Sequence, residues 1–312
     1  MNAPLLKADK LTKQYKLQGR PINALQDFSF TIFSGETIGL IGESGSGKST
    51  AGKLLLRLED PSAGQIFYKG TEITNFTRKQ MLPFRKKMQI IFQDPFASLN
   101  PRMLVGDIIA EPLEIHHLHL NQKEDRVSEL LQQVGLPSDA ARRYPHEFSG
   151  GQRQRIAIAR ALAVEPEFIV CDEPISALDL SIQAQIVNLL KDLQQELGLA
   201  YLFIAHDLAM VKYLSHRVAV LYRGSVVEFG PSDELFSNPQ HPYTQALIDA
   251  IPHIGKPSQV FLEGEIPNTT AAQPTGCPFY SRCPKATSIC KQEEPPLITI
   301  GQQQVKCHLH KF

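Results

Sequence analysis

The sequence predicts an α/β fold with a mostly parallel core sheet covered by helices, an N-terminal antiparallel β layer, an inserted helical region and a small C-terminal extension. Three short runs are apolar on both faces and end in polar residues, which is typical of central strands in such a sheet. A run near the N-terminus alternates apolar and polar residues instead. Stripes of apolar residues at helical spacing lie between the strands.

The antiparallel layer is predicted from two segments. Residues 28–32 alternate as a half-buried strand does, and residues 65–68 form a short β-like run between Gly64 and Gly70. The central strands are predicted at residues 37–41, 168–171 and 202–205.

Two helices are predicted from their apolar stripes. The longer one, residues 182–197, has a stripe that would face the core. The shorter one contains the stripe 127–134, and Asn121 with Glu124 three residues later predicts a capped start. Both would stop at a glycine. These glycines are Gly198 and Gly135.

The composition excludes some classes of protein. Lys plus Arg and Asp plus Glu number 32 each, so no long-range field would recruit nucleic acid or an anionic membrane. Every apolar stretch is broken well before the roughly 20 residues that span a bilayer, and the N-terminus has no secretory apolar region. We expect a cytoplasmic chain. The composition shifts to Pro, Gln, Thr and Cys after residue 250, which predicts domains at 1–250 and 251–312.

Residues 42–49 match the phosphate-binding pattern G-x-x-x-x-G-K-[ST], between a predicted strand and a helix. The glycines would let backbone N–H groups surround a β-phosphate, Lys48 would reach the β and γ oxygens, and the Ser49 hydroxyl would bind Mg²⁺. The expected nucleotide-binding residues of this segment are Gly42, Glu43, Ser44, Gly45, Ser46, Gly47, Lys48, Ser49 and Thr50.

Polar side chains follow two of the predicted strands. The strand at 168–171 ends in Asp172 and Glu173, and buried strands rarely end in two carboxylates without a cation or a reactant beside them. We expect Asp172 to hold Mg²⁺ and Glu173 to orient and deprotonate an attacking water. His206 follows the strand at 202–205 and would contact the γ-phosphate.

A second anion site is predicted at residues 147–155, with the sequence EFSGGQRQR. A serine followed by two glycines at a helix start leaves backbone N–H groups bare and directs a partial positive charge outward. The residues by themselves leave open which phosphate this site would bind.

In their order along the chain, these motifs resemble the nucleotide-binding subunit of an ATP-binding cassette (ABC) transporter. The resemblance covers about residues 5–250 and implies a P-loop NTPase cassette that hydrolyses ATP with Mg²⁺, with a helical subdomain at about 94–163. It is carried by Tyr15, GESGSGKS, Gln93, FSGGQRQR, CDEP, SALD at 176–179 and His206.

The resemblance implies further roles. Tyr15 would stack on adenine, and Gln93 would sense Mg²⁺ and the attacking water. Ser176 to Asp179 would form a loop at the subunit seam. In the family, the signature sequence of one subunit closes over the ATP of another, so the second anion site would serve a partner's ATP. The signature residues would be Ser149, Gly150, Gly151 and Gln152, preceded by Phe148 where the family usually has leucine.

Three stretches resemble the oligopeptide/dipeptide importer branch. Two others, residues 142–162 and 171–186, resemble the second of the two paired ATPase subunits in that branch. The resemblance implies a peptide cargo, although relatives carry nickel or glutathione. It also implies a second ATPase subunit, identical or paralogous, two membrane permeases, an external binding protein, and a place on the cytoplasmic face of the membrane. The three stretches are FQDPFASLNPRM at 92–103, HPYTQAL at 241–247 and GCPFYSRCPKATSIC at 276–290.

Four cysteines lie in the C-terminal segment with the spacing C-x5-C-x6-C-x16-C. A cytoplasmic setting argues against disulfides, and a metal would supply folding energy that this poorly hydrophobic segment lacks. A [4Fe–4S] cluster accepts varied spacing, whereas zinc usually takes C-x(2–4)-C pairs. We favour the cluster, and zinc and free thiols remain open. The residues are Cys277, Cys283, Cys290 and Cys307.

Two other functions compete with transport. The first is an ABC-type ATPase that acts on ribosomes or DNA without a membrane partner. Such proteins usually carry two cassettes or a long coiled-coil insertion, and this chain has one uninterrupted cassette. The second is a nucleotide-binding scaffold without catalysis, which the Asp172–Glu173 pair disfavours.

Overall fold

The computed structural model describes residues 3–17, 20–250 and 276–310. The chain divides into two compact units. We call one the helical unit and the other the phosphate-loop unit, and each is described by itself. The helical unit comprises Met1–Ala3, Ile32–Thr37 and Asn75–Ala205, and the phosphate-loop unit comprises Pro4–Thr31, Ile38–Thr74 and His206–Phe312.

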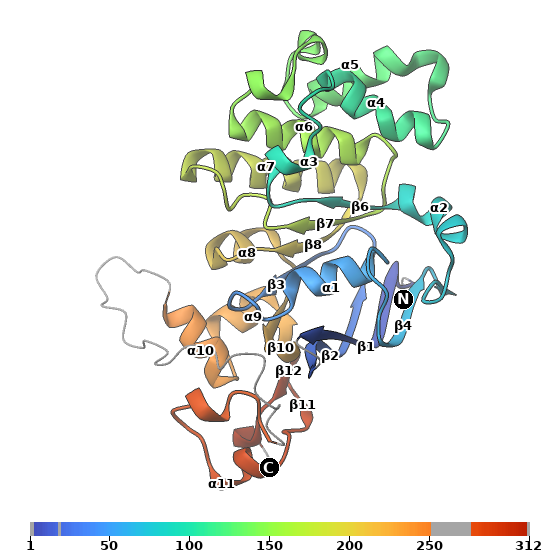
Figure 1. Cartoon of the computed structure of the whole chain (residues 1–312). Helices are drawn as coiled ribbons and strands as arrows, with labels where there is room; N and C mark the ends of the chain where they lie inside the picture. The colour runs from blue at the N-terminus through green and yellow to red at the C-terminus, as the bar shows by residue number, and fades with distance from the viewer. Residues whose placement is uncertain (1–2, 18–19, 251–275, 311–312) are drawn as a thin grey trace. The chain divides into compact units, whose positions relative to one another are not determined.

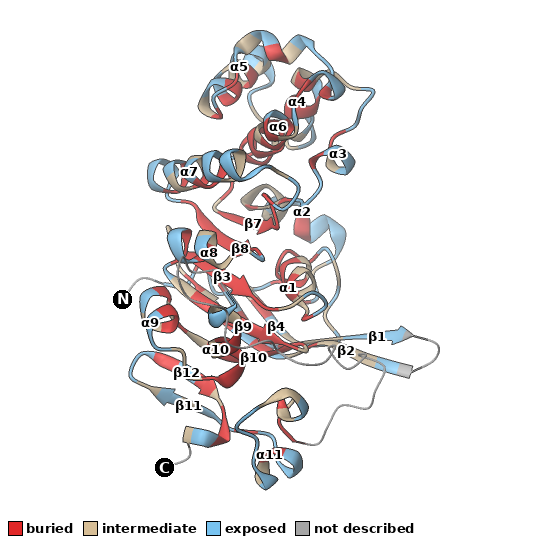
Figure 2. Ribbon diagram, turned by 90° about the vertical axis from the view of Figure 1, so that its left-hand side faces the viewer, coloured by how far each residue is buried: buried red, intermediate tan, exposed pale blue. Residues whose placement is uncertain are grey.

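Three parallel strands form the sheet of the helical unit: β6 (Met88–Ile91), β7 (Phe168–Asp172) and β8 (Ala200–Ile204). Every residue of β7 and β8 is buried (Figure 2), as their apolar sequences predict for strands covered on both faces. The register places Ile91 beside Cys171 and Asp172 beside Ile204. The carboxyl ends of the three strands therefore lie at one edge.

The helices of this unit follow the predicted pattern (Figure 1). Helix α7 spans the predicted segment and ends at Gly198, whose φ of 65° is left-handed. Helices α4, α5 and α6 pack against one another. The bounds are α2 (Arg78–Lys87), α3 (Pro95–Ser98), α4 (Val105–Ile115), α5 (Lys123–Gln133), α6 (Gly150–Leu162) and α7 (Leu180–Leu197), with 3₁₀ turns at Leu120–Gln122, Ser138–Arg142 and Pro145–Glu147.

The predicted cap of α5 is wrong. Asn121 lies inside a 3₁₀ turn, and the cap position is Gln122, whose side chain accepts no capping hydrogen bond within the described residues. The turn already occupies the residues that an Asn121 cap would need in extended backbone. Gly135 follows the helix with a φ of 73°, so its predicted end is confirmed to within two residues.

The phosphate-loop unit contains the predicted antiparallel layer, a sheet with the order β2-β1-β4-β5. The two segments predicted from their alternation lie within β2 and β4. The bounds are β1 (Leu6–Leu17), β2 (Arg20–Ile32), β4 (Ala63–Tyr68) and β5 (Thr71–Glu72).

A second sheet in this unit contains the strand before the phosphate loop. Strand β3 (Thr37–Ile41) is parallel to β9 (Arg217–Tyr222), which pairs with β10 (Ser225–Pro231). The C-terminal segment adds β12 (Gln303–Lys306) to the free edge of β10, and β11 (Leu297–Ile300) pairs with β12. Residues 276–310 are thus joined to the same sheet as the strand that leads into the phosphate loop.

Five helices are described in the phosphate-loop unit. Helix α1 begins directly after the phosphate loop, and α10 carries the stretch 241–247. Across the described ranges, no helix of either unit is long and apolar enough to cross a membrane. The bounds are α1 (Lys48–Leu55), α8 (Leu208–Leu214), α9 (Ser232–Ser237), α10 (Pro242–Asp249) and α11 (Ser288–Gln292), with 3₁₀ turns at Tyr280–Arg282 and His308–His310.

Candidate functional site

The loop between β3 and α1 has a backbone that requires glycine. Gly42 and Gly47 have φ angles of 151° and 105°, which L-residues rarely adopt. A Cβ at Gly42 would lie 2.2 Å from the Leu221 carbonyl oxygen, and one at Gly47 would lie 2.3 Å from that of Ala24. Neighbouring backbone therefore closes around the loop, and its shape depends on these two glycines.

This loop can surround an anion. Gly47 precedes α1 and has no side chain that could cap the helix, and uncapped helix starts of this kind bind phosphates through their first N–H groups. Lys48 is 5% exposed, and its Nζ donates to the carbonyl oxygens of Gly42 and Glu43 at 2.8 and 3.0 Å. The buried Oγ of Ser46 has no hydrogen-bond partner among the residues that the structure describes. Ser49 and Thr50 lie in the first turn of α1.

The ends of β6 and β7 bring Gln93 and Glu173 together. Because Ile91 and Cys171 are paired in a parallel register, the residues two positions further on leave the sheet at the same edge. Gln93 Nε2 donates to Glu173 Oε2 at 2.8 Å. An amide and a carboxylate that meet in this way can hold and activate a water molecule.

Asp172 and Glu173 are both buried, at 9% and 8% exposed. The Glu173 N–H donates to the Ile204 carbonyl oxygen, which extends the pairing of β7 with β8. The φ angle of Glu173 is 49°, which lies in the left-handed region. This conformation costs a residue with a side chain about 1–2 kcal/mol. Strain of this kind is common at functional sites, where it directs a reactive group.

The second predicted anion site is the start of α6. Ser149 is the cap residue, and its Oγ accepts from the Gln152 N–H at 3.3 Å while Gln152 Oε1 accepts from the Ser149 N–H at 3.0 Å. A Cβ at Gly151 would lie 2.4 Å from Cγ2 of Ile182, so α6 packs closely on α7 at this point. Asp179 is the cap residue of α7.

Comparison with known proteins identifies the family. Residues 25–176 match the sequence model of the ABC transporter family, and residues 227–290 match that of the oligopeptide/dipeptide transporter C-terminal region. A Brucella abortus protein named as a peptide import ATP-binding protein is 51% identical over 98% of this chain and 94% of its own. The chain belongs to the ABC transporter ATP-binding proteins, in the oligopeptide/dipeptide branch.

Other relatives agree with this assignment. A Bacillus subtilis protein named as an oligopeptide transport ATP-binding protein is 50% identical over 99% of this chain and 96% of its own. A dimeric ATP-binding cassette solved with ADP and phosphate has a TM-score of 0.66 and 30% identity over 73% of this chain and 98% of its own. A component of an ABC transporter complex from Clostridium perfringens has a TM-score of 0.68 and 29% identity over 76% of this chain and 92% of its own. The predicted fold of an ATP-hydrolysing ABC cassette is confirmed.

Two further predicted site residues of this ABC protein, His206 and Tyr15, also belong to the phosphate-loop unit. His206 is exposed and lies just before Asp207, the cap residue of α8. Tyr15 lies on β1, is 39% exposed, and its hydroxyl donates to Glu59. The γ-phosphate contact of His206 and the adenine contact of Tyr15 stay predictions.

The four cysteines of the ABC protein's C-terminal segment do not form a ligand set. Three are buried, Cys283 is partly exposed, and the Cys277 N–H donates to the Cys290 carbonyl oxygen at 2.8 Å. Within the described ranges, no three or more His, Cys, Asp or Glu side chains are grouped as a metal site would require. Burial raises the pKa of Cys277 to about 11, which disfavours the thiolate that binds metals. This arrangement does not support the [4Fe–4S] cluster.

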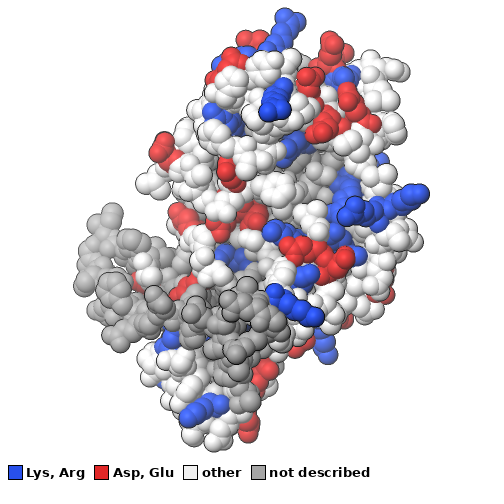
Figure 3. Space-filling view, viewed as in Figure 1, with Lys and Arg blue, Asp and Glu red and all other residues white. Residues whose placement is uncertain are grey.

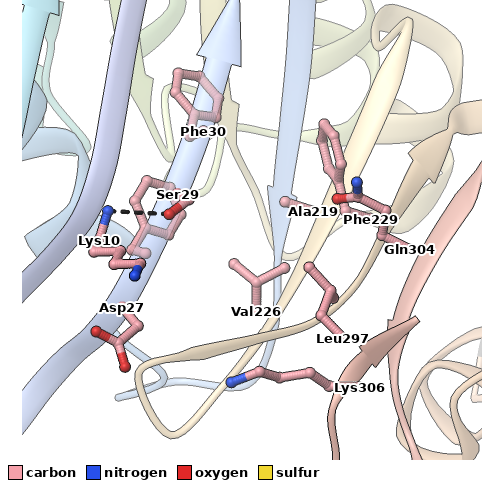
Figure 4. Close-up of a pocket in the computed structure, with 11 residues that line it drawn as sticks. Lys10, Asp27, Ser29, Phe30, Ala219, Val226, Phe229, Leu297, Gln304 and Lys306 are labelled. Carbon is pink, nitrogen blue, oxygen red and sulfur yellow. Dashed lines mark hydrogen bonds between the residues drawn. The ribbon is translucent and has the colours of Figure 1, made fainter. Parts of the chain in front are cut away.

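The phosphate-loop unit of the ABC protein also contains a cavity that no residue of the phosphate loop lines. This cavity of about 320 Å³ is lined by Phe28, Phe229 and Leu297 and by the charged Lys10, Asp27 and Lys306 (Figure 4). On the face shown in Figure 3, basic and acidic side chains are intermixed.

Sequence reasoning missed two residues that hold the phosphate loop. The Tyr243 hydroxyl accepts from the Glu43 N–H, and the Arg282 guanidinium donates to the Glu43 carboxylate. The signal was present, because both residues lie in stretches that resemble the peptide-importer branch. Their contact with the loop could not be predicted, because they follow it by 200 and 239 positions.

Proposed function

We propose that this chain hydrolyses ATP to power the transport of peptides through a membrane permease. The names of the relatives, peptide import and oligopeptide transport, support the cargo. The single observation that supports hydrolysis by this chain is the Gln93–Glu173 pair at the carboxyl edge of β6 and β7. A cassette that only bound nucleotide would not need a strained, buried carboxylate at that position.

The roles within one chain follow from the chemistry of the residues. Lys48 and the N–H groups at the start of α1 bind the β- and γ-phosphates, and Tyr15 stacks on the adenine. Glu173 orients the attacking water and takes its proton, Gln93 holds Glu173 and the water in place, and His206 contacts the γ-phosphate. Mg²⁺ would be held by Ser49, Gln93 and Asp172, and it would neutralise charge on the phosphate oxygens.

A second chain completes each nucleotide site. The signature residues at the start of α6 act on the ATP of the partner cassette, and Asp179 contributes at the seam between the two. The permease partners, the external binding protein and a peripheral position on the cytoplasmic face follow from the family. The cassette is residues 1–250, and residues 251–312 are its branch-specific extension.

The test is the substitution Glu173→Gln in the full chain. We expect kcat for ATP hydrolysis to fall by about 10²–10⁴-fold, because the general base is lost while the shape of the side chain is kept. ATP binding persists, and sedimentation shows dimers that are trapped with nucleotide. The matched control is Glu129→Gln on α5, an exposed carboxylate of the same unit. Normal ATP turnover by the Glu173→Gln variant would refute the assignment of the base.

The cargo and the cysteines need separate measurements. Co-purification of permease subunits from a detergent extract supports transport, whereas co-purification of ribosomes or DNA refutes it. For the C-terminal segment, the alternatives are free thiols, zinc and a [4Fe–4S] cluster. Iron and zinc analysis of the purified chain distinguishes the three states.

A further inference from the structure

Two motifs within residues 241–250 and 276–310, which we together call the C-terminal region, have no part in the proposed chemistry, yet both reach the phosphate loop at Glu43. The Tyr243 hydroxyl accepts from the backbone N–H of Glu43 at 2.9 Å. The two terminal nitrogens of Arg282 donate to the two carboxylate oxygens of Glu43 at 2.7 and 2.9 Å. Backbone and side chain of this one residue are therefore both held by residues outside the cassette motifs.

Tyr243 is fixed in its place. It is fully buried, in the first turn of α10 after Pro242 at the first helical position. His241 caps the helix through Nδ1, which accepts from the Tyr243 N–H at 3.0 Å, and the His241 N–H donates to the Glu228 carboxylate at 2.8 Å. In the three-residue stretch His-Pro-Tyr, the histidine caps the helix, the proline begins it, and the tyrosine presents its hydroxyl to the loop.

Arg282 is fixed by the residues around it. Its side chain is 6% exposed, and its guanidinium lies 6.0 Å from the ring centre of Tyr222. Three residues earlier, the buried Phe279 packs against Tyr222 and Tyr243, with ring centres 5.2 and 5.4 Å away. A bidentate contact from a guanidinium that is already ordered loses little side-chain entropy, so it is stronger than an exposed ion pair.

The segment that carries Arg282 is itself anchored to the sheet of the same unit. Strand β12 pairs with β10, and a Cβ at Gly276 would lie 2.3 Å from the Cys290 carbonyl oxygen. The contact to Glu43 raises the pKa of Arg282 above its ordinary value, with the hydrogen bond to Glu43 as the main cause. The C-terminal segment is therefore an ordered support beside the loop.

Glu43 is a position where support matters to a phosphate ligand. It follows Gly42, and its carbonyl oxygen accepts from Lys48 Nζ. An unpaired carboxylate in this loop would repel the phosphates that the loop binds, and a loosely held loop would lose entropy when it closed on them. The Arg282 contact addresses both costs, because it pairs the charge and fixes the loop.

We propose that Arg282 and Tyr243 are positioning residues for ATP, through which the C-terminal region keeps the phosphate loop ready to bind nucleotide. This inference rests on the proposed function and extends it to two residues that have no part in the chemistry proposed there. Its signature is a change in ATP affinity rather than in the chemical step, because the pair acts on the binding loop.

The experiment uses the full chain, with ATP affinity measured by titration of a fluorescent ATP analogue and turnover measured by phosphate release. For Arg282→Gln we expect KM and Kd for ATP to rise about tenfold while kcat stays within about twofold. Glu43→Gln should give a similar rise, and the double variant should be no worse than either single one, because the two residues act through one contact. Tyr243→Phe should raise Kd by about threefold, since one hydrogen bond is lost.

The control is Lys285→Gln, which removes a charge from the same segment at an exposed residue bonded to Gln245. If Arg282→Gln destabilises the segment, Glu43→Gln tests the same contact from the other side. Unchanged Kd in both variants, with a wild-type chain that binds ATP, would overturn this inference and leave the proposed function intact. A wild-type chain that does not bind ATP would overturn the proposed function instead.

Discussion

Helices α1 and α6 both begin at a predicted anion site, but different parts of the chain shape their first turns. At α6, Ser149 and Gln152 cap each other, so residues three positions apart hold the helix start. At α1, the cap residue is Gly47, and the loop before it is held at Glu43 by residues from the C-terminal region. One anion site is built locally, and the other depends on tertiary contacts.

This difference agrees with the roles proposed for the two helix starts, α6 at the partner's ATP and α1 at the chain's own ATP. The start of α6 already uses some of its own donors, so it can add only part of a phosphate shell. The start of α1 has no side-chain cap, and the loop before it needs support from elsewhere to keep its shape. A helix start without a side-chain cap can offer its N–H groups to a phosphate. In this protein the C-terminal region fixes the loop before that helix through Tyr243 and Arg282.

The substitution expected to have the largest effect is at Gly47, and it tests whether the start of α1 depends on tertiary contacts. In Gly47→Ala, the new Cβ meets the Ala24 carbonyl oxygen 2.3 Å away in a left-handed backbone, so the loop must move. We expect ATP affinity to fall by about 100-fold or more. The matched variant is Gly45→Ala, where φ is 75° but nothing lies within 4 Å, and which should cost only about 1–2 kcal/mol of stability. Equal affinities in the two variants would show that packing around the loop does not matter.

The next largest effect is the loss of stability at low pH that we expect from His241, the residue that caps α10. Burial lowers the pKa of His241 to about 3, with a smaller contribution from His310, below the value of 6.5 for the unfolded chain. As the pH falls below 6.5, the unfolded state takes up a proton on His241 while the folded state does not. The stability that the neutral, buried His241 gives the folded state is therefore lost progressively between pH 6.5 and about 3. Between pH 6.5 and 5 the free energy of unfolding should fall by about 2 kcal/mol more in the wild type than in His241→Asn.

The asparagine variant keeps an acceptor for the helix cap and removes the titrating ring. Burial raises the pKa of Glu228, the neighbour of His241, but this carboxyl is common to both chains and cancels in the difference. Denaturant unfolding at a series of pH values measures the effect. Parallel pH curves for the two chains would show that His241 does not contribute.

The smallest effect is expected at Ser149. Ser149→Ala removes a local cap and should lower the free energy of unfolding by about 1 kcal/mol, whereas Ser149→Asp keeps an acceptor and should lie within about 0.5 kcal/mol of the wild type. ATP binding to the single chain should be unaffected in both. ATP turnover by the dimer should fall in both, most in Ser149→Asp, because a carboxylate would face the partner's γ-phosphate. A loss of ATP binding by the single chain would remove the distinction between the two sites.

Much of the site could be predicted because its signals are local. The glycines of the loop at 42–47, the carboxylates after the strand at 168–171 and the cap at Ser149 each follow from a few adjacent residues. The meeting of Gln93 with Glu173 was implied only by family resemblance, and the parallel register of β6 and β7 supplies its physical reason. The Asn121 cap failed because a 3₁₀ turn, which depends on the packing of the helical unit, competed with it.

The sequence by itself predicted the loop glycines, the two carboxylates after β7 and the cap at Ser149, because backbone conformation and charge at a motif depend on neighbours within a few positions. Only the tertiary structure decided what holds the phosphate loop, because the hydrogen bonds to Glu43 come from Tyr243 and Arg282, far along the chain. Arg282 reaches the loop from a segment that β12 joins to β10, and Tyr243 reaches it from α10. Contacts between residues this far apart in the sequence cannot be predicted from local patterns, because such patterns do not depend on which distant side chain lies nearby in the fold.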